Sequence, residues 1–166
     1  MSETDLEFKE IVAADVPELT GVMTRAFDDD ARKHLGEPKG GPPGYDNGEF
    51  FRQWLFGYPE TVGYKAVSAG RIVGAAIVWL LDTGENILGT IFVDPDRQDR
   101  GVGARLWTFL EAAHPAARRW RLETPSFATK NHHFYENCGF RRVEVKPPEG
   151  DMPWESWVYV KEGVGG

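Results

Sequence analysis

The sequence predicts an α+β fold, in which a mixed, mostly antiparallel central sheet of six or seven strands is flanked by about four helices. Two observations lead to this prediction. Segments with apolar residues at helical spacing are interspersed with short segments rich in β-branched and aromatic residues, and glycine and proline separate them. The 166 residues are 41% hydrophobic, which is enough for one domain, residues 1–166, with one core.

The N-terminal part predicts an edge strand followed by a helix. Residues 6–12 alternate loosely, and Asp15 with Glu18 has the spacing of a capping pair that opens a helix. Six apolar residues at helical spacing predict its buried face: Val16, Leu19, Val22, Met23, Ala26 and Phe27. Residues 36–48 contain so many glycines and prolines that we predict a loop, and loops of this length are usually functional lids or mobile linkers.

The middle of the sheet is predicted over residues 62–93. Segments 62–69 and 71–81 flank Gly70 and favour an antiparallel hairpin. Segment 87–93 is apolar on both alternating faces, Gly89 and Thr90 aside, which is typical of a central strand covered on two sides.

Aromatic residues near position 50 are expected to pack a second helix. The other elements are predicted in the C-terminal half. A helix over about 101–113 is predicted by an apolar stripe that consists of Val102, Leu106, Phe109, Leu110 and Ala113. A strand (120–124), a short helix (129–138) and two closing strands (140–145 and 154–160) complete the domain, and residues 162–166 are expected to form a flexible tail.

Composition excludes several classes of protein. A net charge of -7 argues against a nucleic-acid partner, since phosphate binding relies on clustered Lys and Arg. The longest apolar run, 75–81, is too short to span a membrane, and the acidic N-terminus lacks the basic start of a signal peptide, so we expect no membrane partner and a cytoplasmic protein. The single Cys138 predicts a buried small hydrophobe, and the four histidines show no paired spacing, so no metal is expected.

The segment 91–106 carries the strongest chemical signal, because a buried strand runs into a glycine-bearing turn that opens an amphipathic helix. Backbone N–H groups at a helix start bind anions, and Gly101 and Gly103 would let a ligand approach the backbone. A P-loop is excluded because no Gly-Lys-Ser/Thr follows, and a dinucleotide fingerprint lacks its third glycine. From this turn alone, a plain helix start remains an alternative.

Two motifs resemble those of one family. The residues Gln98-Asp99-Arg100-Gly101-Val102-Gly103 resemble the acyl-CoA signature Gln/Arg-x-x-Gly-x-Gly/Ala of the GNAT N-acetyltransferase superfamily. The segment Phe134-Tyr135-Glu136-Asn137-Cys138-Gly139-Phe140 is similar to the family's Leu-Tyr-Glu-x-x-Gly-Phe. The resemblance is clear over about 62–145. It implies the three-layer acyl-CoA N-acyltransferase fold and acetyl-CoA as the cosubstrate.

The resemblance also assigns roles to residues. It implies that the backbone of Ile91, Phe92 and Val93 pairs with the pantetheine arm and helps polarise the acetyl carbonyl. The pyrophosphate would be cradled by the residues that open the helix, with Gln98 in the first polar position: Asp99, Arg100, Gly101, Val102, Gly103 and Ala104.

The resemblance implies catalytic candidates as well. Tyr135 matches a tyrosine that protonates the departing thiolate, with a core aromatic as the alternative, and Glu123 has the spacing of a glutamate base in some relatives. Where the family often has asparagine this chain has Ala128, so Asn131 is the candidate for contacting the cofactor. His132 and His133 are weaker candidates, because adjacent helical residues point in different directions.

The expected activity is transfer of acetyl from acetyl-CoA to a primary amine of a small molecule, peptide or protein, by direct attack in a ternary complex. Acidic residues near the first loop would favour a cationic amine or would form a solvated surface: Asp28, Asp29, Asp30, Glu37, Asp46 and Glu49. The alternatives are a non-catalytic acyl-CoA-binding module and, more remotely, an NAD-dependent oxidoreductase. Relatives commonly dimerise, so a homodimer is an open option.

Overall fold

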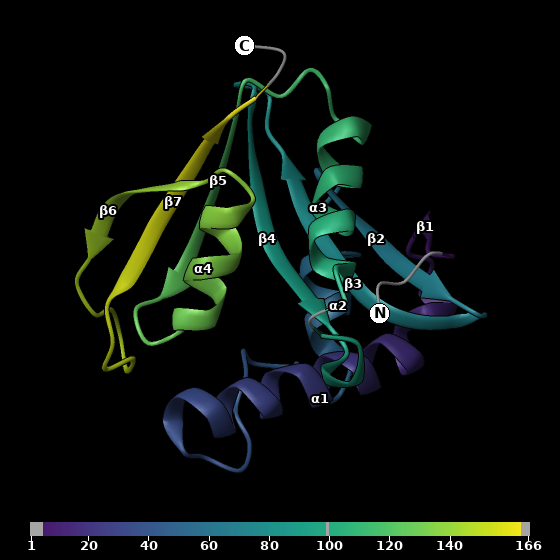
Figure 1. The fold of residues 1–166 in the computed structure, drawn as a ribbon, viewed down its shortest axis with the longest axis horizontal. Helices are drawn as coiled ribbons and strands as arrows, with labels where there is room; N and C mark the ends of the chain where they lie inside the picture. Colours follow the sequence, from purple (N-terminus) through teal and green to yellow (C-terminus); the bar gives the residue numbers. More distant parts are fainter. Residues whose placement is uncertain (1–4, 99, 164–166) are drawn as a thin grey trace.

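The computed structural model describes residues 5–98 and 100–163, and in them it confirms the α+β prediction (Figure 1). Seven strands form one sheet in the order β1-β2-β3-β4-β5-β7-β6. All neighbours are antiparallel except β4 and β5, which are parallel. The strands are β1 (Glu7–Glu10), β2 (Thr61–Ser68), β3 (Arg71–Leu80), β4 (Glu85–Val93), β5 (Arg119–Pro125), β6 (Arg141–Lys146) and β7 (Ser156–Glu162).

Helices cover both faces of the sheet. Within the described residues they are α1 (Val16–Leu35), α2 (Glu49–Trp54), α3 (Val102–Ala113) and α4 (Thr129–Asn137), with short 3-10 turns η1 (Ala13–Asp15) and η2 (Pro95–Arg97). Leu19 of α1 and Phe51 of α2 pack on one face with Phe92 of β4. Leu106 of α3 and Tyr135 of α4 pack in a second cluster on the other face. The three-layer arrangement is therefore confirmed. None of the described helices is long and apolar enough to cross a membrane.

The first helix forms where the apolar spacing predicts it, but the predicted capping pair is wrong. Asp15 accepts a hydrogen bond from the Val12 amide at 2.9 Å, before the helix begins. Glu18 accepts one from the Ile72 amide of β3 at 2.8 Å, so its carboxylate ties α1 to the sheet instead of capping it. The helix ends at Gly36, whose φ of 68° is the left-handed conformation that favours glycine.

The central hairpin is confirmed with close bounds. Ala69 and Gly70 both have positive φ, at 52° and 78°, which gives the tight two-residue turn that joins β2 to β3. β4 is the fourth of seven strands, as its two-sided apolar pattern predicts. Its register against β3 shifts between Ile77 and Val78, so that Gly89 is an extra, bulged residue.

Three details differ from the sequence-based expectations. Ala113 is exposed on α3, and Trp107 is buried there in its place, because the stripe rotates toward Trp120 and Phe140. Glu162 is the last residue of β7, so the strand extends into the predicted tail, while 164–166 lie outside the described residues. Cys138 is half-buried rather than buried, and burial raises the pKa of its thiol to about 11.

Residues 36–48 contain no helix or strand, which confirms the loop.

Candidate functional site

The turn after β4 is held in place by Asp94. Its amide donates to the Val73 carbonyl at 2.8 Å, and its carboxylate accepts from the Asp96 amide at 3.1 Å. The other carboxylate oxygen contacts the Arg25 guanidinium of α1 at 2.8 Å. The chain that leaves β4 is therefore fixed on both sides before it reaches the glycines.

The start of α3 has the conformation that an anion site requires. Gly101 is the N-cap residue with a φ of 81°, and a Cβ there would meet nothing within 4 Å. The first intrahelical bond runs from the Arg105 amide to the Gly101 carbonyl, at 3.0 Å. The N–H groups that precede Arg105 in the first turn therefore have no intrahelical acceptor. Asp99 lies outside the described residues, and Arg100 is exposed.

Gly103 has a different structural reason from the one the sequence suggested. A Cβ at this position would lie 2.9 Å from Cε1 of Phe134 on α4 and 3.6 Å from Cγ2 of Val93. The glycine thus gives α4 room to pack against α3. Its predicted contact with a pyrophosphate remains a prediction.

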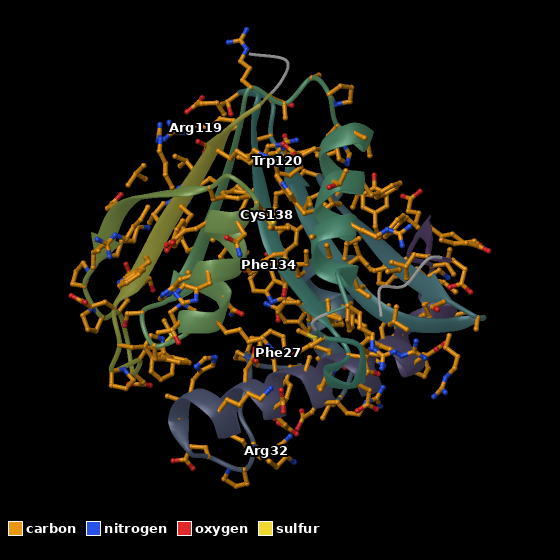
Figure 2. All side chains as sticks on the ribbon, viewed as in Figure 1. Phe27, Arg32, Arg119, Trp120, Phe134 and Cys138 are labelled. Carbon is orange, nitrogen blue, oxygen red and sulfur yellow. The ribbon has the colours of Figure 1, made fainter. Side chains whose placement is uncertain are left out.

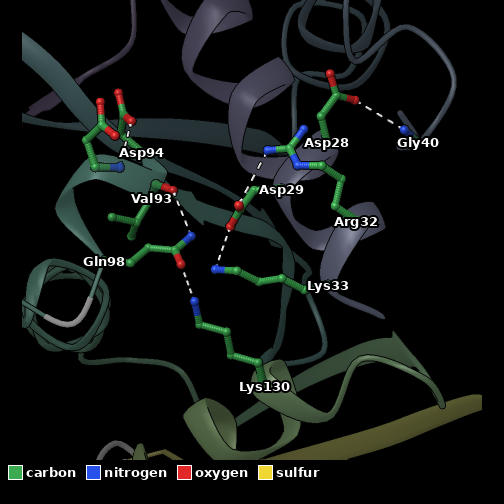
Figure 3. A network of polar contacts seen from close by, with 10 residues as sticks. Asp28, Asp29, Arg32, Lys33, Gly40, Val93, Asp94, Gln98 and Lys130 are labelled. Atoms are coloured by element: carbon green, nitrogen blue, oxygen red, sulfur yellow. Dashed lines mark hydrogen bonds and ion pairs between the residues drawn. The ribbon is translucent and has the colours of Figure 1, made fainter. Parts of the chain in front are cut away.

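Gln98 connects the turn to both β4 and α4 (Figure 3). Its side-chain amide donates to the Val93 carbonyl at 3.4 Å, and its carbonyl oxygen is contacted by the Lys130 ammonium. A hydrogen bond of 3.4 Å is weak, so a better-placed donor could readily replace the Gln98 amide at the Val93 carbonyl. Lys130 was not singled out from the sequence, because only the fold brings α4 beside the turn.

β4 and β5 pair over only three positions and then run apart. The pairs are Glu85 with Arg119, Asn86 with Trp120 and Ile87 with Arg121, and no further pairing between the two strands is found in the described part of the chain. We call the unpaired ends, β4 from Leu88 to Val93 and β5 from Leu122 to Pro125, the fork; it is visible between the two strands in Figure 1.

The free edge of β4 in the fork presents the backbone of two of the three predicted residues. Because the Asp94 amide bonds to β3, antiparallel alternation turns the backbone of Phe92 toward β3 as well. The N–H and C=O groups of Ile91 and Val93 then face the fork. An extended chain with amide groups could pair with this edge as an additional strand would.

Tyr135 lies on α4, nine-tenths buried, at 9% exposure. Its ring packs against the rings of Phe134, Phe140 and Tyr159. Burial raises the pKa of its phenol strongly, and the charge of Asp30 and the Cys138 thiol raise it further. Within the part of the chain that the structure describes, its hydroxyl has no hydrogen-bond partner. The phenol therefore stays protonated and free to donate. Asn131 precedes it by one helical turn, half-buried on the same face of α4.

One cavity lies at the end of β4 and another lies beside its middle, and Tyr135 lines neither of them. One, of about 350 Å³, lies between α1 and the turn and includes Arg25, Asp94 and Arg97. The other, of about 320 Å³, is more apolar and is lined by Pro42, Pro43, Phe50, Trp54, Ile77, Trp79, Gly89 and Thr90. The predicted loop and the bulge of β4 thus both contribute residues to the lining of this cavity.

A family model described as the acetyltransferase (GNAT) domain matches residues 60–142, half of the chain. The chain belongs to the GNAT acetyltransferases. Searching curated proteins by sequence gave no match.

Solved GNAT structures share the fold over nearly the whole chain. An acetyltransferase from Thermus thermophilus superposes with a TM-score of 0.76 at 20% identity, covering 98% of this chain and 99% of its own. The ribosomal-protein-S18-alanine N-acetyltransferase of Escherichia coli gives 0.74 at 18% identity, covering 95% and 94%. The PaiA N-acetyltransferase of Thermoplasma acidophilum, solved in complex with coenzyme A, gives 0.72 at 12% identity, covering 96% and 99%.

Glu123, the second catalytic candidate, lies apart from Tyr135 in this GNAT fold. It alternates with the buried Leu122 and Thr124 on β5, so its side chain projects from the face of the sheet opposite to theirs. The side chain is 39% exposed, with one carboxylate oxygen 3.2 Å from Arg121 and the other 3.3 Å from Lys146. Both oxygens thus already have cationic partners, and its role as a base stays a prediction.

The two histidines differ in their surroundings. His132 is buried, its Nε2 lies 2.9 Å from the Pro125 carbonyl, and its ring stacks on Trp157 with centroids 4.1 Å apart. Burial lowers its pKa. These contacts make His132 part of the packing between α4 and β7, whereas His133 is exposed.

Proposed function

We propose that this GNAT protein transfers the acetyl group of acetyl-CoA to a primary amine while both substrates are bound. One observation carries the proposal: the free edge of β4 in the fork leads directly to the unpaired amides at the start of α3. The pantetheine arm of the cosubstrate needs backbone partners, and the pyrophosphate that follows it needs an anion site. The edge of β4 and the start of α3 offer these two features in the same order. The Thermoplasma acidophilum protein of the same fold binds coenzyme A, which supports the assignment.

In this proposal each part of the cosubstrate meets a part of the chain. The backbones of Ile91 and Val93 form hydrogen bonds with the amide groups of pantetheine. The Gln98 side chain gives up its hydrogen bond to the Val93 carbonyl so that this carbonyl can accept from pantetheine. The amides that open α3, from Gly101 to Ala104, bind the pyrophosphate, and Asn131 faces the arm from α4. The bound thioester supplies an activated acetyl group, and the protein supplies its position.

Tyr135 acts as the general acid in this proposal. Its phenol is protonated at neutral pH because burial and the charge of Asp30 raise its pKa. It would give that proton to the thiolate sulfur as the acetyl group leaves. A phenol is suited to this task because its high pKa keeps the proton on the oxygen at neutral pH, so a donor is in place when the thiolate forms.

Transfer to nitrogen is supported by the names of relatives in fold. The Escherichia coli structure is an alanine N-acetyltransferase and another, complexed with coenzyme A, is an aminoglycoside 6'-N-acetyltransferase. The acceptors of these two proteins differ widely, so the acceptor of this chain has to be found by experiment.

The test is an assay for thiol release from acetyl-CoA, run with a panel that includes a diamine, an aminoglycoside and a peptide with N-terminal alanine. Amine-dependent release that produces the acetylated amine supports the proposal. Binding of acetyl-CoA without turnover on any amine would instead favour a non-catalytic acyl-CoA-binding module. Glu123→Gln in the same assay tests the predicted base, and an unchanged rate would remove it from that role.

A further inference from the structure

One stripe of α1 crosses the fork from β4 to β5. Phe27, Asp30 and His34 are spaced by three and four residues, so they share one face of the helix. The ring of Phe27 lies 6.5 Å from that of Phe92 on β4, and the ring of His34 lies 6.4 Å from that of Phe127, just after β5. Asp30 lies between these two contacts and therefore faces the fork. Figure 2 shows Phe27 beneath the end of β4.

Asp30 differs from its two acidic neighbours in lacking a partner. Asp28 accepts from the Tyr45 hydroxyl at 2.6 Å and from the Gly40 amide at 3.1 Å. Asp29 is paired with Lys33 at 2.8 Å, and Figure 3 shows this ion pair together with the contact between Asp28 and Gly40. For the half-buried carboxylate of Asp30, no hydrogen bond or ion pair is found among residues 5–98 and 100–163.

Two further polar groups near Asp30 also have no partner in the described residues. The Tyr135 hydroxyl is one, and the charge of Asp30 raises the pKa of this phenol, so the two groups are close enough to interact electrostatically. The buried Nε2 of His34, one helical turn beyond Asp30, is the other. Buried polar atoms are nearly always hydrogen-bonded, so the unpartnered Nε2 of His34, next to a half-buried carboxylate without a partner, is typical of a place where a polar ligand binds.

The charges around Asp30 do not neutralise it. Burial raises the pKa of its carboxyl, and the opposing effects of His34 and Lys130 are smaller. Lys130 contacts Gln98, and Lys33 is paired with Asp29. A partly buried carboxylate without a cation costs free energy, which a bound cation would recover.

We propose that the Asp30 carboxylate binds the ammonium group of the acceptor, so that this enzyme selects cationic amines over neutral acceptors of the same shape. The inference rests on the proposed function and specifies its substrate class. Asp30 lies on the α1 side of the sheet, and Tyr135 lies on the α4 side. The ammonium held at Asp30 would lose one proton to solvent before attack. The neutral amine would then approach the thioester through the fork, and its nitrogen would bond to the acetyl carbon as the thiolate leaves and takes the proton of Tyr135 on the opposite side.

The test measures binding rather than turnover. Pentane-1,5-diamine and the isosteric pentane-1,5-diol are titrated calorimetrically into the protein with unreactive CoA present, at about 0.15 M salt to screen distant charges. The wild-type protein should bind the diamine at least about tenfold more tightly than the diol, as expected for a charge-assisted hydrogen bond. Equal affinities would overturn the proposal.

Variants then assign the preference to one residue. Asp30→Asn should remove the preference for the diamine, whereas Glu37→Gln, which removes an exposed carboxylate just after α1, should keep it. Preference retained in Asp30→Asn would overturn the inference. Titration with CoA checks that each variant is folded, and Asp30→Ser replaces a variant that is not. If the protein prefers the diamine in the titration but acetylates no amine in the thiol-release assay, the proposed transfer is refuted while the Asp30 site stands.

Discussion

Gly103 on α3 and Phe134 on α4 occupy neighbouring positions with no room for a β-carbon between them. A Cβ on Gly103 would lie 2.9 Å from Cε1 of Phe134 and 3.2 Å from its Cζ. Phe134 immediately precedes Tyr135, so the first turn of α3 sets the position of the proposed general acid. The start of α3, which is proposed to bind the pyrophosphate, therefore packs directly against α4, which carries the proposed acid.

Gly103→Ala should therefore affect stability and turnover together. We expect a loss of about 1–3 kcal/mol in the free energy of unfolding from overpacking, with a lower kcat because α4 shifts. Phe134→Leu in the same chain should restore part of both, since the two sites are in contact. Thermal unfolding and steady-state kinetics measure the effects. A Gly103→Ala protein as stable and active as wild type would refute the packing argument.

Tyr135→Phe should lower kcat by about 100-fold or more, as expected for loss of a general acid, with little change in the acetyl-CoA dissociation constant. The raised pKa of Tyr135 also predicts that its ionisation causes no loss of rate up to about pH 10. Tyr159→Phe is the matched control, because this hydroxyl donates to Glu136 at 2.7 Å. It should cost about 1 kcal/mol of stability and leave kcat unchanged. An unchanged kcat in Tyr135→Phe at saturating substrates would exclude the role.

Lys130→Met should weaken acetyl-CoA binding several-fold and reduce its dependence on salt. Lys130 contacts Gln98 beside the proposed pyrophosphate site, so its removal takes away a cation close to the ligand's negative charge. Lys39→Met, an exposed position on the 36–48 loop, is the control for net charge. If both variants lost affinity equally, the effect would be one of overall charge and not of this contact.

Stability should fall as the pH drops below about 6.5, the unfolded-state pKa of histidine. Burial lowers the folded-state pKa of His132, so the unfolded chain binds a proton more readily and the stabilisation is complete only above that pH. His132→Phe, which retains a ring on Trp157, should flatten the fall in melting temperature between about pH 7.5 and 5.5. Some slope should remain, because burial lowers the pKa of His114 as well. His133→Gln should retain the full slope; a wild-type slope in His132→Phe would contradict the assignment.

The sequence was informative where a local pattern determines the structure. The apolar spacing of α1, the Gly70 turn and the passage from β4 through Gly101 into α3 are local features, and their bounds differ by one or a few residues from those observed. The two family motifs depend on local geometry in the same way. The GNAT fold and the glycine-bearing start of α3 could therefore be predicted without coordinates, whereas anion binding at that start remains a prediction.

Long-range contacts could not be predicted in this way. Glu18 has the spacing of a capping residue but bonds to Ile72, 54 positions away, because the sheet offers a better donor. From the sequence, the acidic run that contains Asp30 could favour a cationic amine or form a solvated surface, and nothing in the spacing shows that α1 crosses the fork. Gly103 appeared to serve a ligand, although its neighbour is Phe134, which comes 31 residues later in the chain.

The most direct test of the account is calorimetric titration of the protein with acetyl-CoA, CoA and NAD, because it examines the fork without requiring the acceptor. We predict binding of acetyl-CoA and CoA in the micromolar range and no binding of NAD, with acetyl-CoA affinity reduced in Gly101→Ala, which must adopt a left-handed conformation at a cost of about 1 kcal/mol. Binding of NAD in place of CoA, or of none of the three, would contradict the assignment of the fork as an acyl-CoA site.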